Sequence, residues 1–529
     1  MALSLTAPKI EWRALWAKVR PQLPDLLGLA VAFLYGSPTI SYAFGRDQAI
    51  FHYIGREWLE GRIPYRDSFD LKPPAIYLLH ALSVLLFGPH VWAIRLIELL
   101  GVVSAGVLAG LAVRREGPRA RGELGLCAMV SVTWYYSTLD FWDSGQAEIW
   151  QGWFLLAAYV SLLRIKSVLR GAYVGGLLAG VATMFKFTAG LGALLLVLPL
   201  VSRAYALAQE PRKRALEIAR ALLVYGAGGL TIIALFLGYY AYEGALPYLV
   251  ELAAYIRYYT KSSWNPPNPG EMTRDYWTRS GMWLIAFFFA WLIAAYEAYR
   301  RRSYRVLAGA AMAMVLLMGT VVQVAVQKKF FNYHWGVVAP FLTLIASYGV
   351  AECARRSAVS AWLATSGFVL ASFAMTPGWP TNWGNSYRLY TLGPFWEYVH
   401  DRIDYEQLMT VFIGNQNYNW PAQRAIAKAI NERKQPGDLL HVRGFELGIY
   451  AMTSLHTPSR FVSEMPLDEP ALEFNRPAWR KEHDDALWGA RPRFFVGFFD
   501  RVEDDANILA HGYHEIARAG LFVLFERNE

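Results

Sequence analysis

The chain has 529 residues, of which 55% are hydrophobic and only 18% are charged. Soluble domains carry about a quarter charged residues, so the composition excludes an ordinary soluble protein. The formal net charge is +9. Most of the excess Lys and Arg lies in short loops between apolar runs, a pattern that sets membrane orientation. We therefore expect no nucleic-acid partner.

Apolar runs of roughly 20 residues, long enough to cross a bilayer core as helices, recur along the chain. The first run has no small-residue cleavage site after it, so we expect a retained helix rather than a signal peptide. Apolar length and loop charge predict a mainly α-helical, polytopic membrane protein with about eleven transmembrane helices. The expected spans are 26–44, 92–113, 122–139, 147–163, 171–185, 187–202, 221–241, 281–298, 306–326, 335–353 and 358–376.

Lys and Arg are distributed unevenly between the two sets of loops. The set that includes the N-terminal segment holds 22 of them, and the opposite set holds 13. The positive-inside rule places the first set in the cytoplasm. The N-terminus is then cytoplasmic, and an odd number of spans places the C-terminus outside.

Two domains are expected: a transmembrane domain over 1–376, with a first outside loop at 45–91, and an extracytoplasmic α/β domain over 377–529. The second opens with a linker at 377–383. Apolar patterning in it predicts two helices and three strands, at 422–433, 439–442, 446–453, 493–499 and 521–525. Cys127 and Cys353 lie far apart without a partner motif, so neither a disulfide nor a metal knuckle is indicated.

The first outside loop carries the densest group of polar residues. Asp47 comes directly after the first span, where a carboxylate can act as a general base in a partly desolvated cleft. On the chemistry of the residue alone, an interfacial anchor is the favoured explanation of Asp47. The apolar stretch 75–87 is too short for a full crossing and predicts a juxtamembrane helix.

A second acidic site lies between the third and fourth spans. Glu148 begins the fourth span and faces the same side as Asp47. Asp140 and Asp143 have a spacing compatible with a metal site, but a pair of aspartates alone is weak evidence, and a solvated loop is the favoured explanation. We expect no obligatory metal or other cofactor.

Five cations from four segments face the outside: Lys72, Arg95, Lys186, Lys328 and Lys329. Converging cations can hold a phosphate through charge-assisted hydrogen bonds, whereas each one alone suits a headgroup contact or a snorkelling side chain. Aromatic residues and His334 follow Lys329. Aromatic rings can stack on sugars, and an interfacial aromatic belt would look similar.

Five segments of the first loop and second span have a characteristic order and spacing. They are RDQAIFHYI at 46–54, GRIPYRD at 61–67, FDLKPPAIY at 69–77, FG at 87–88 and AIR at 93–95. This block resembles the amino-terminal signature of the C-type glycosyltransferase (GT-C) superfamily. It is most similar to bacterial relatives of dolichyl-phosphate-mannose protein mannosyltransferases, which include lipid A aminoarabinose transferases. The segments 180–190 and 329–340 look like later parts of the family pattern.

The resemblance implies that Asp47 is the catalytic base and that Lys72 holds the carrier phosphate. Glu148 matches a second acidic position by its placement. Gln48 stands where many relatives have an acid, and Ile50 stands where aminoarabinose transferases tend to have arginine. The second departure argues against a lipid A acceptor.

The expected reaction is an inverting transfer of a sugar from a polyprenyl-phosphate donor to an extracytoplasmic lipid, glycan or protein acceptor. The expected location is a bacterial inner membrane, among membrane lipids. Lys72, helped by Lys186 and Lys329, would stabilise the leaving phosphate. Arg95 and Lys328 are further candidates for binding the donor phosphate. Tyr65, Asp70 and His334 are candidates for substrate contact. The alternatives are a transporter or flippase for lipid-linked glycans, and an O-antigen ligase or polymerase.

Overall fold

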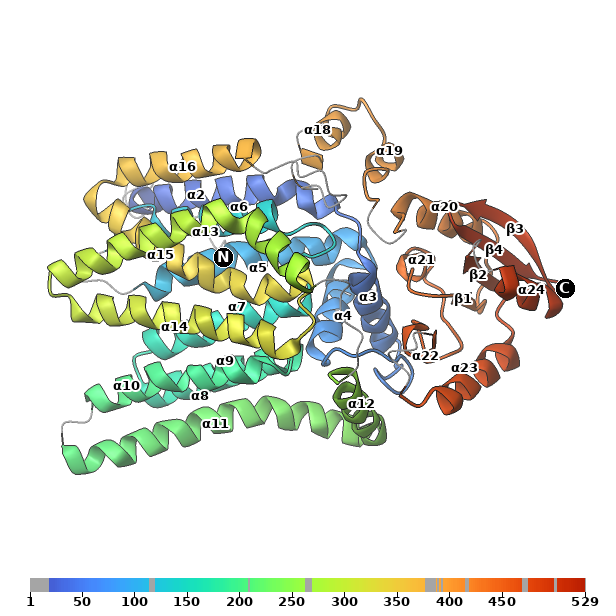
Figure 1. Ribbon diagram of the computed structural model, residues 1–529, viewed down its shortest axis with the longest axis horizontal. Helices are drawn as coiled ribbons and strands as arrows, with labels where there is room; N and C mark the ends of the chain where they lie inside the picture. The colour runs from blue at the N-terminus through green and yellow to red at the C-terminus, as the bar shows by residue number, and fades with distance from the viewer. Residues whose placement is uncertain are drawn as a thin grey trace, which may run out of the picture.

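The computed structural model describes residues 19–528 except 114–118, 208–209, 262–268, 376–386, 388–389, 392, 414–417, 469–473 and 499–501. Long helices form a bundle, a small sheet lies beyond one end of it, and shorter helices lie between the two (Figure 1). The expected linker at 377–383 and the expected domain boundary fall outside the described residues, so both stay predictions.

Every expected span coincides with one helix of the bundle, except 187–202, which is divided between two. These helices are α2 (Leu23–Gly36) with the 3-10 turn η2 (Ser37–Ser41), α5 (Val91–Ala112), α6 (Glu123–Thr138), α7 (Ala147–Arg164), α8 (Val168–Phe185), α9 (Ala189–Leu195), α10 (Val197–Leu207), α11 (Pro211–Tyr242), α13 (Pro269–Arg300), α14 (Tyr304–Gln327), α15 (Ala339–Arg356) with the 3-10 turn η3 (Asn332–Val338), and α16 (Ala358–Met375). Among the described residues, 8 segments are long and apolar enough to cross a membrane. The exact count of eleven therefore stays a prediction.

The helices α6, α7 and α16 are not among those 8 segments. The first two run through the middle of the bundle, where nearly all residues of α6 and most residues of α7 are buried. Two polar side chains of α6 bond inside the protein: Ser131 Oγ donates to the carbonyl of Val102 at 2.9 Å, and Tyr135 Oη donates to Glu98 Oε1 at 2.9 Å. Central helices can be less apolar than lipid-facing ones because protein, not lipid, surrounds them.

Helices α8 and α11 approach each other closely enough to need glycine at the contact. A Cβ atom on Gly176 would collide with the backbone carbonyl of Tyr225. Small residues allow membrane helices to pack backbone against backbone. This contact matters for the site because Lys186 directly follows the last residue of α8.

Three shorter helices form a layer at the sheet end of the bundle: α3 (Arg46–Leu59), α4 (Ala75–Phe87) and α12 (Leu246–Tyr259) (Figure 1). The 13 residues of α4 match the expected juxtamembrane helix. The basic turn between α13 and α14 lies at the opposite end of the bundle (Figure 1). Which side of the membrane each end faces stays a prediction.

The C-terminal part is an α/β unit, as expected. Its elements are α18 (Pro394–Val399), α19 (Tyr405–Met409), α20 (Trp420–Asn431), β1 (Leu440–Val442), α21 (Gly448–Thr453), α22 (Met465–Asp468), α23 (Arg476–Ala490), β2 (Phe494–Phe498), α24 (Val502–Ala510), β3 (Tyr513–Ala519) and β4 (Phe522–Arg527). The sheet order is β1-β2-β4-β3; β1 pairs parallel with β2, and the other neighbours pair antiparallel.

Successive side chains of β2 and β4 point to opposite faces of the sheet, and both faces are apolar. Phe494 and Leu524 belong to the large core shared with α20 and α21, while Phe495 and Val523 pack with residues of α23 and α24. The two helices and three strands expected from the sequence are present within a few residues. The strand β3 was missed because it is an edge strand with mostly exposed or half-exposed side chains.

The C-terminal unit docks on the first outside loop through α3. Arg46 Nε donates to Glu446 Oε1 at 2.7 Å, and Arg56 donates to the carbonyls of Tyr450 and Leu455 at 3.1 and 2.9 Å. The loop that carries Asp47 and Lys72 is therefore held between the bundle and the C-terminal unit.

Candidate active site

Glu148 is the centre of a buried cluster of charges at the sheet end of the bundle. It lies in the first turn of α7 and is 0% exposed. Lys72 Nζ lies 3.1 Å from Glu148 Oε1, Lys186 pairs with the same oxygen, and His334 Nε2 lies 3.5 Å from it. Four segments thus converge: the loop before α4, α7, the end of α8, and η3. The helix dipole of α7 also favours a carboxylate at this position.

The backbone of Lys72 is fixed by two tyrosines. The hydroxyls of Tyr65 and Tyr77 donate to its carbonyl at 2.8 and 3.1 Å. Tyr65 has a φ of 71°, a left-handed conformation that is strained for a bulky residue. Tyr77 also donates to Asp70 Oδ2 at 2.7 Å. Tyr65 and Asp70, expected to contact substrate, here hold the segment that presents Lys72.

The two lysines differ in how readily they lose a proton. Burial opposes the charge of Lys72, but Glu148, Asp47 and Asp70 together raise its pKa. Burial lowers the pKa of Lys186 to about 8, against the attraction of Glu148. Lys72 also lies 5.0 Å from the ring centre of Tyr333, a cation–π distance.

Asp47 is the second residue of α3 and is half-buried. Burial raises its pKa to about 6; the nearby charges of Lys72 and Lys186 lower it, and those of Asp70 and Glu148 raise it further. Within the described part of the chain, no hydrogen bond or ion pair occupies its carboxylate. Asp47 thus combines what a general base needs: a pKa near neutrality, an unoccupied carboxylate and neighbouring cations.

The contacts of Gln48 explain why an amide, rather than an acid, stands at this position. Its side-chain oxygen accepts from the backbone N–H of Gly45 and so caps α3. Its amide nitrogen donates to the carbonyls of Phe141, Trp142 and Ser144 at 3.2, 3.2 and 2.6 Å. A carboxylate could not donate these bonds. Gln48 therefore ties the Asp47 helix to the loop before α7.

Arg95 was expected to bind phosphate, but in the structure its guanidinium bonds to other groups of the protein. Its guanidinium is 2% exposed and donates to Glu98, Ser144 and the carbonyls of Ala43 and Phe141 at 2.6–3.0 Å. An arginine with these four bonds supports the loops around the site. Its geometry does not support direct contact with a phosphate.

The two neighbouring lysines Lys328 and Lys329 point to different surroundings. Lys329 is buried and lies 4.6 Å from the ring centre of Tyr259. Lys328 is exposed at the end of α14 in a left-handed conformation, and in the part of the chain that the structure describes it makes no contact with the Glu148 cluster. Lys329 stays a candidate for phosphate contact, and Lys328 suits a headgroup.

Asp140 and Asp143 lie in the loop that Gln48 and Arg95 hold. Asp140 Oδ1 accepts from the N–H of Phe141 at 2.5 Å, and Asp143 is buried. Over the described residues, the groups that could hold a metal ion include neither aspartate. Both side chains thus belong to the loop that precedes α7.

Sequence reasoning missed Tyr77, Tyr259 and Tyr333 as residues of the site. Tyr77 stands five residues after Lys72 in the family-like block, and Tyr333 stands next to His334, so their positions offered a signal. Tyr259 ends α12, and only the folded chain brings it to Lys329.

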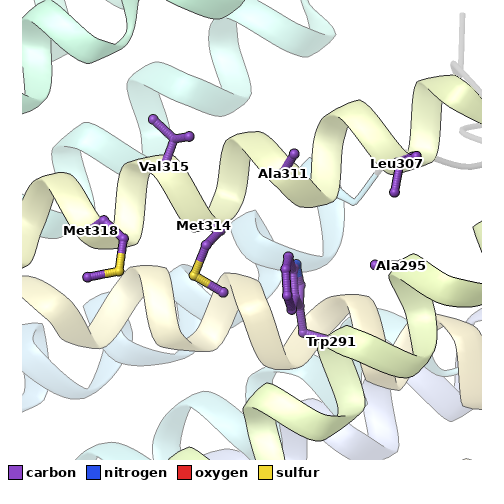
Figure 2. A pocket seen from close by; sticks show the side chains of 7 residues that line it. All are labelled: Trp291, Ala295, Leu307, Ala311, Met314, Val315 and Met318. Carbon is purple, nitrogen blue, oxygen red and sulfur yellow. The ribbon is translucent and has the colours of Figure 1, made fainter.

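A groove of about 420 Å³ lies away from this cluster, between α13 and α14. Figure 2 shows Trp291 on α13 and Met314 and Met318 on α14 lining it. None of its lining residues is charged. Its apolar lining offers no group for catalysis.

No family model matches the sequence, and no curated protein matches it by sequence. Solved structures do match. ArnT from Cupriavidus metallidurans in its apo state has a TM-score of 0.60 at 17% identity, over 94% of this chain and 97% of that one. ArnT bound to undecaprenyl phosphate has a TM-score of 0.58 at 15% identity, over 97% of each chain.

The chain has the GT-C fold. The fold expected from the resemblance of the 45–95 block is therefore the fold that the structure has. Archaeal oligosaccharyltransferase AglB from Archaeoglobus fulgidus also matches, at 10% identity over 95% of this chain and 74% of that one, but its TM-score of 0.37 is too low to support an argument. In this GT-C fold the Glu148 cluster lies where the bundle meets the layer of short helices.

Proposed function

We propose that the protein is a membrane glycosyltransferase that takes a sugar from a polyprenyl-phosphate carrier and transfers it, with inversion, to an extracytoplasmic lipid, glycan or protein acceptor. The observation that carries the proposal is the arrangement around Glu148: two half-buried lysines, 13% and 17% exposed, beside an unoccupied carboxylate, Asp47, at one end of a membrane bundle. The GT-C fold and the undecaprenyl phosphate bound to the similar ArnT structure support it. The membrane is proposed to be a bacterial inner membrane.

Each group has a role in the proposed reaction. Asp47 accepts the proton of the acceptor hydroxyl as its oxygen attacks the anomeric carbon. The bond from that carbon to the phosphate oxygen breaks, and polyprenyl phosphate leaves with its negative charge. Lys72 and Lys186 stabilise that charge, a contribution often worth about 3 kcal/mol or more. Glu148 holds the two lysines in place. No metal is assigned to this step.

Ile50 is an apolar side chain and is buried in α3. This position therefore offers an acceptor no charged group. This fits the sequence-based argument against a lipid A acceptor, and the class of acceptor stays open within the proposal. A transporter or flippase would bind the same carrier but would leave the bond between sugar and phosphate intact. Release of free polyprenyl phosphate by the purified protein separates these two functions.

Carrier binding should depend on Lys72 more than on the exposed Lys328. Replacing Lys72 by methionine keeps most of the side-chain volume and removes the charge. Affinity for polyprenyl phosphate should fall by at least about tenfold, since a charge-assisted hydrogen bond contributes roughly 1.5–3 kcal/mol. Titration of the purified protein with polyprenyl phosphate measures this.

Lys328→Asn is the matched control, because asparagine tolerates the left-handed backbone at that position. It should leave the affinity within about twofold of wild type, given that single exposed charges contribute little. Equal losses in the two variants would mean that the carrier responds to general surface charge rather than to the buried cluster.

The rate should have a bell-shaped pH dependence. Asp47 must be deprotonated to accept a proton, and its pKa is raised to about 6 by burial. Lys186 must be protonated to hold phosphate, and burial lowers its pKa to about 8. The value of kcat/KM should therefore rise up to about pH 6, level off, and fall above about pH 8.

Lys186→Arg provides the check on the alkaline side, because arginine stays protonated there. Its profile should lose the decline above pH 8, even if its maximal rate is lower. An unchanged alkaline decline would assign that decline to another group.

A further inference from the structure

The C-terminal unit contains a second buried cluster, separate from the Glu148 site. Its members are His441 on β1, Glu464 just before α22, and His483 on α23, and their side chains are 0%, 1% and 1% exposed. Nothing in the transfer reaction uses these residues.

The three side chains direct one atom each toward a common point. His441 Nε2 lies 3.0 Å and His483 Nε2 lies 3.4 Å from the same oxygen, Glu464 Oε1. All three atoms lie within 4.8 Å of one another. In a tetrahedral zinc site with bonds of about 2.0–2.1 Å, neighbouring ligand atoms are about 3.3–3.4 Å apart. The two measured separations are close to that value.

The opposite nitrogens of both rings face hydroxyl groups. His483 Nδ1 lies 2.8 Å from Ser459 Oγ, and His441 Nδ1 lies 3.3 Å from Thr457 Oγ1. A hydroxyl oxygen can accept the Nδ1–H of a neutral imidazole, which leaves the Nε2 lone pair for a metal. Such outer hydrogen bonds orient the histidines of metal sites and set their tautomer.

We propose that His441, Glu464 and His483 form a binding site for a divalent transition-metal ion, with Zn²⁺ the best match. Two imidazoles and one carboxylate suit zinc, whereas calcium and magnesium prefer all-oxygen sites. The fourth position would be taken by water or by the second oxygen of Glu464. That second oxygen accepts from the N–H of Gly444 at 3.3 Å and lies 3.6 Å from Arg443 Nε. Both contacts leave Oε1 to the metal.

The location of the site suggests a structural role. The segment from Thr457 to Glu464 docks the C-terminal unit on the first outside loop: the N–H of Thr457 donates to the hydroxyl of Tyr53 at 3.1 Å, and the N–H of Phe69 donates to the carbonyl of Arg460 at 2.6 Å. A metal at Glu464 would fix one end of this segment to β1 and α23. This inference does not depend on the transfer chemistry.

Glu57, Glu60 and His456 are a second group with suitable residue types, but their surroundings differ. The two carboxylates approach opposite nitrogens of the one imidazole. Arg62 Nε lies 2.8 Å from Glu57, and Arg56 Nε lies 3.6 Å from Glu60. Two arginines make this group an ion-pair network, and it serves as a control.

The test uses the full-length protein in detergent, purified without a polyhistidine tag. Its metal content is measured by mass spectrometry, and its melting temperature is measured after chelator treatment and after adding Zn²⁺ alone. We expect about one zinc per chain and a melting temperature that falls on stripping and recovers with zinc. A wild-type protein that binds no zinc, or whose melting temperature ignores it, would overturn the proposal.

Variants locate the ion. His483→Gln should lose the zinc, and Ser459→Ala, which removes only the outer hydroxyl, should weaken zinc affinity roughly 10–100-fold. His456→Gln should keep it. Loss of zinc in His456→Gln with retention in Ser459→Ala would contradict the assignment. If His483→Gln fails to fold, Ser459→Ala and the chelation of wild-type protein still decide.

Discussion

Asp47→Asn is expected to lower turnover by roughly 10²–10⁴-fold, the usual contribution of a general base. Asparagine keeps the size of the side chain but cannot take a proton. The cluster of Lys72, Lys186 and Glu148 does not depend on Asp47 for its hydrogen bonds, so carrier affinity should change little. The measurement is the rate of sugar transfer at saturating donor, with carrier affinity measured alongside.

Stability gives this prediction a second readout. Because burial raises the pKa of Asp47 to about 6, its negative charge is disfavoured in the folded protein above that pH. Below about pH 4 the group is protonated in both states, and the difference disappears. Asparagine removes the charge, so at pH 7 the melting temperature of Asp47→Asn should equal or exceed that of wild type.

The same two measurements separate a base from an interfacial anchor. If Asp47 were only an interfacial anchor, the Asp47→Asn protein would be less stable than wild type but would transfer sugar at near the wild-type rate. Glu60→Gln, at the C-terminal cap of the same helix and 43% exposed, is the matched control. It should leave turnover unchanged and shift stability by no more than about 1 kcal/mol, the usual contribution of an exposed ion pair. A folded Asp47→Asn protein with near wild-type turnover would remove Asp47 from the chemistry and leave Glu148 as the next carboxylate to test.

Glu148→Gln is expected to lower the free energy of unfolding by about 3–5 kcal/mol, because removing one partner of a buried ion pair leaves the other charge uncompensated. Here Lys72 and Lys186 both pair with the lost carboxylate. Transfer activity should fall as well, since the lysines would no longer be held together. Thermal unfolding in detergent, compared with wild type, measures the loss.

Bound carrier should partly rescue this variant. A phosphate placed between Lys72 and Lys186 supplies the negative charge that Glu148 provided, so polyprenyl phosphate should raise the melting temperature of Glu148→Gln more than that of wild type. Asp485→Asn, which removes an acid that is 65% exposed, should shift stability by no more than about 0.5 kcal/mol. A Glu148→Gln protein as stable as wild type would mean that the two lysines do not need the carboxylate.

Much of the fold follows from local patterns in the sequence. Apolar length places every bundle helix, and alternation or amphipathic spacing places α20, β1, β2 and β4. The edge strand β3 escapes because its exposed side chains do not alternate clearly. The span count is harder to predict for a different reason: α6 and α7 are surrounded by protein, so their hydropathy does not report on a lipid environment.

The site could be predicted only in part. Lys72, Glu148, Lys186 and His334 were each chosen for polarity at a membrane boundary, and the structure brings them into contact. Arg95 met the same criterion, yet its bonds to loop carbonyls use its guanidinium inside the protein. Contacts between distant segments decide which cation makes its hydrogen bonds inside the protein and which stays available to a ligand. The residue types alone do not carry that information.

The most direct test of the central claim is transfer by the purified protein. The wild-type protein in lipid nanodiscs is incubated with radiolabelled polyprenyl-phosphate sugars and an extract of bacterial membranes, with Asp47→Asn as the matched negative control. We expect label to move to an acceptor while an equal amount of free polyprenyl phosphate forms, and we expect Asp47→Asn to do neither at a comparable rate. Binding of the carrier with its bond to the sugar left intact, in every donor and acceptor combination, would contradict it.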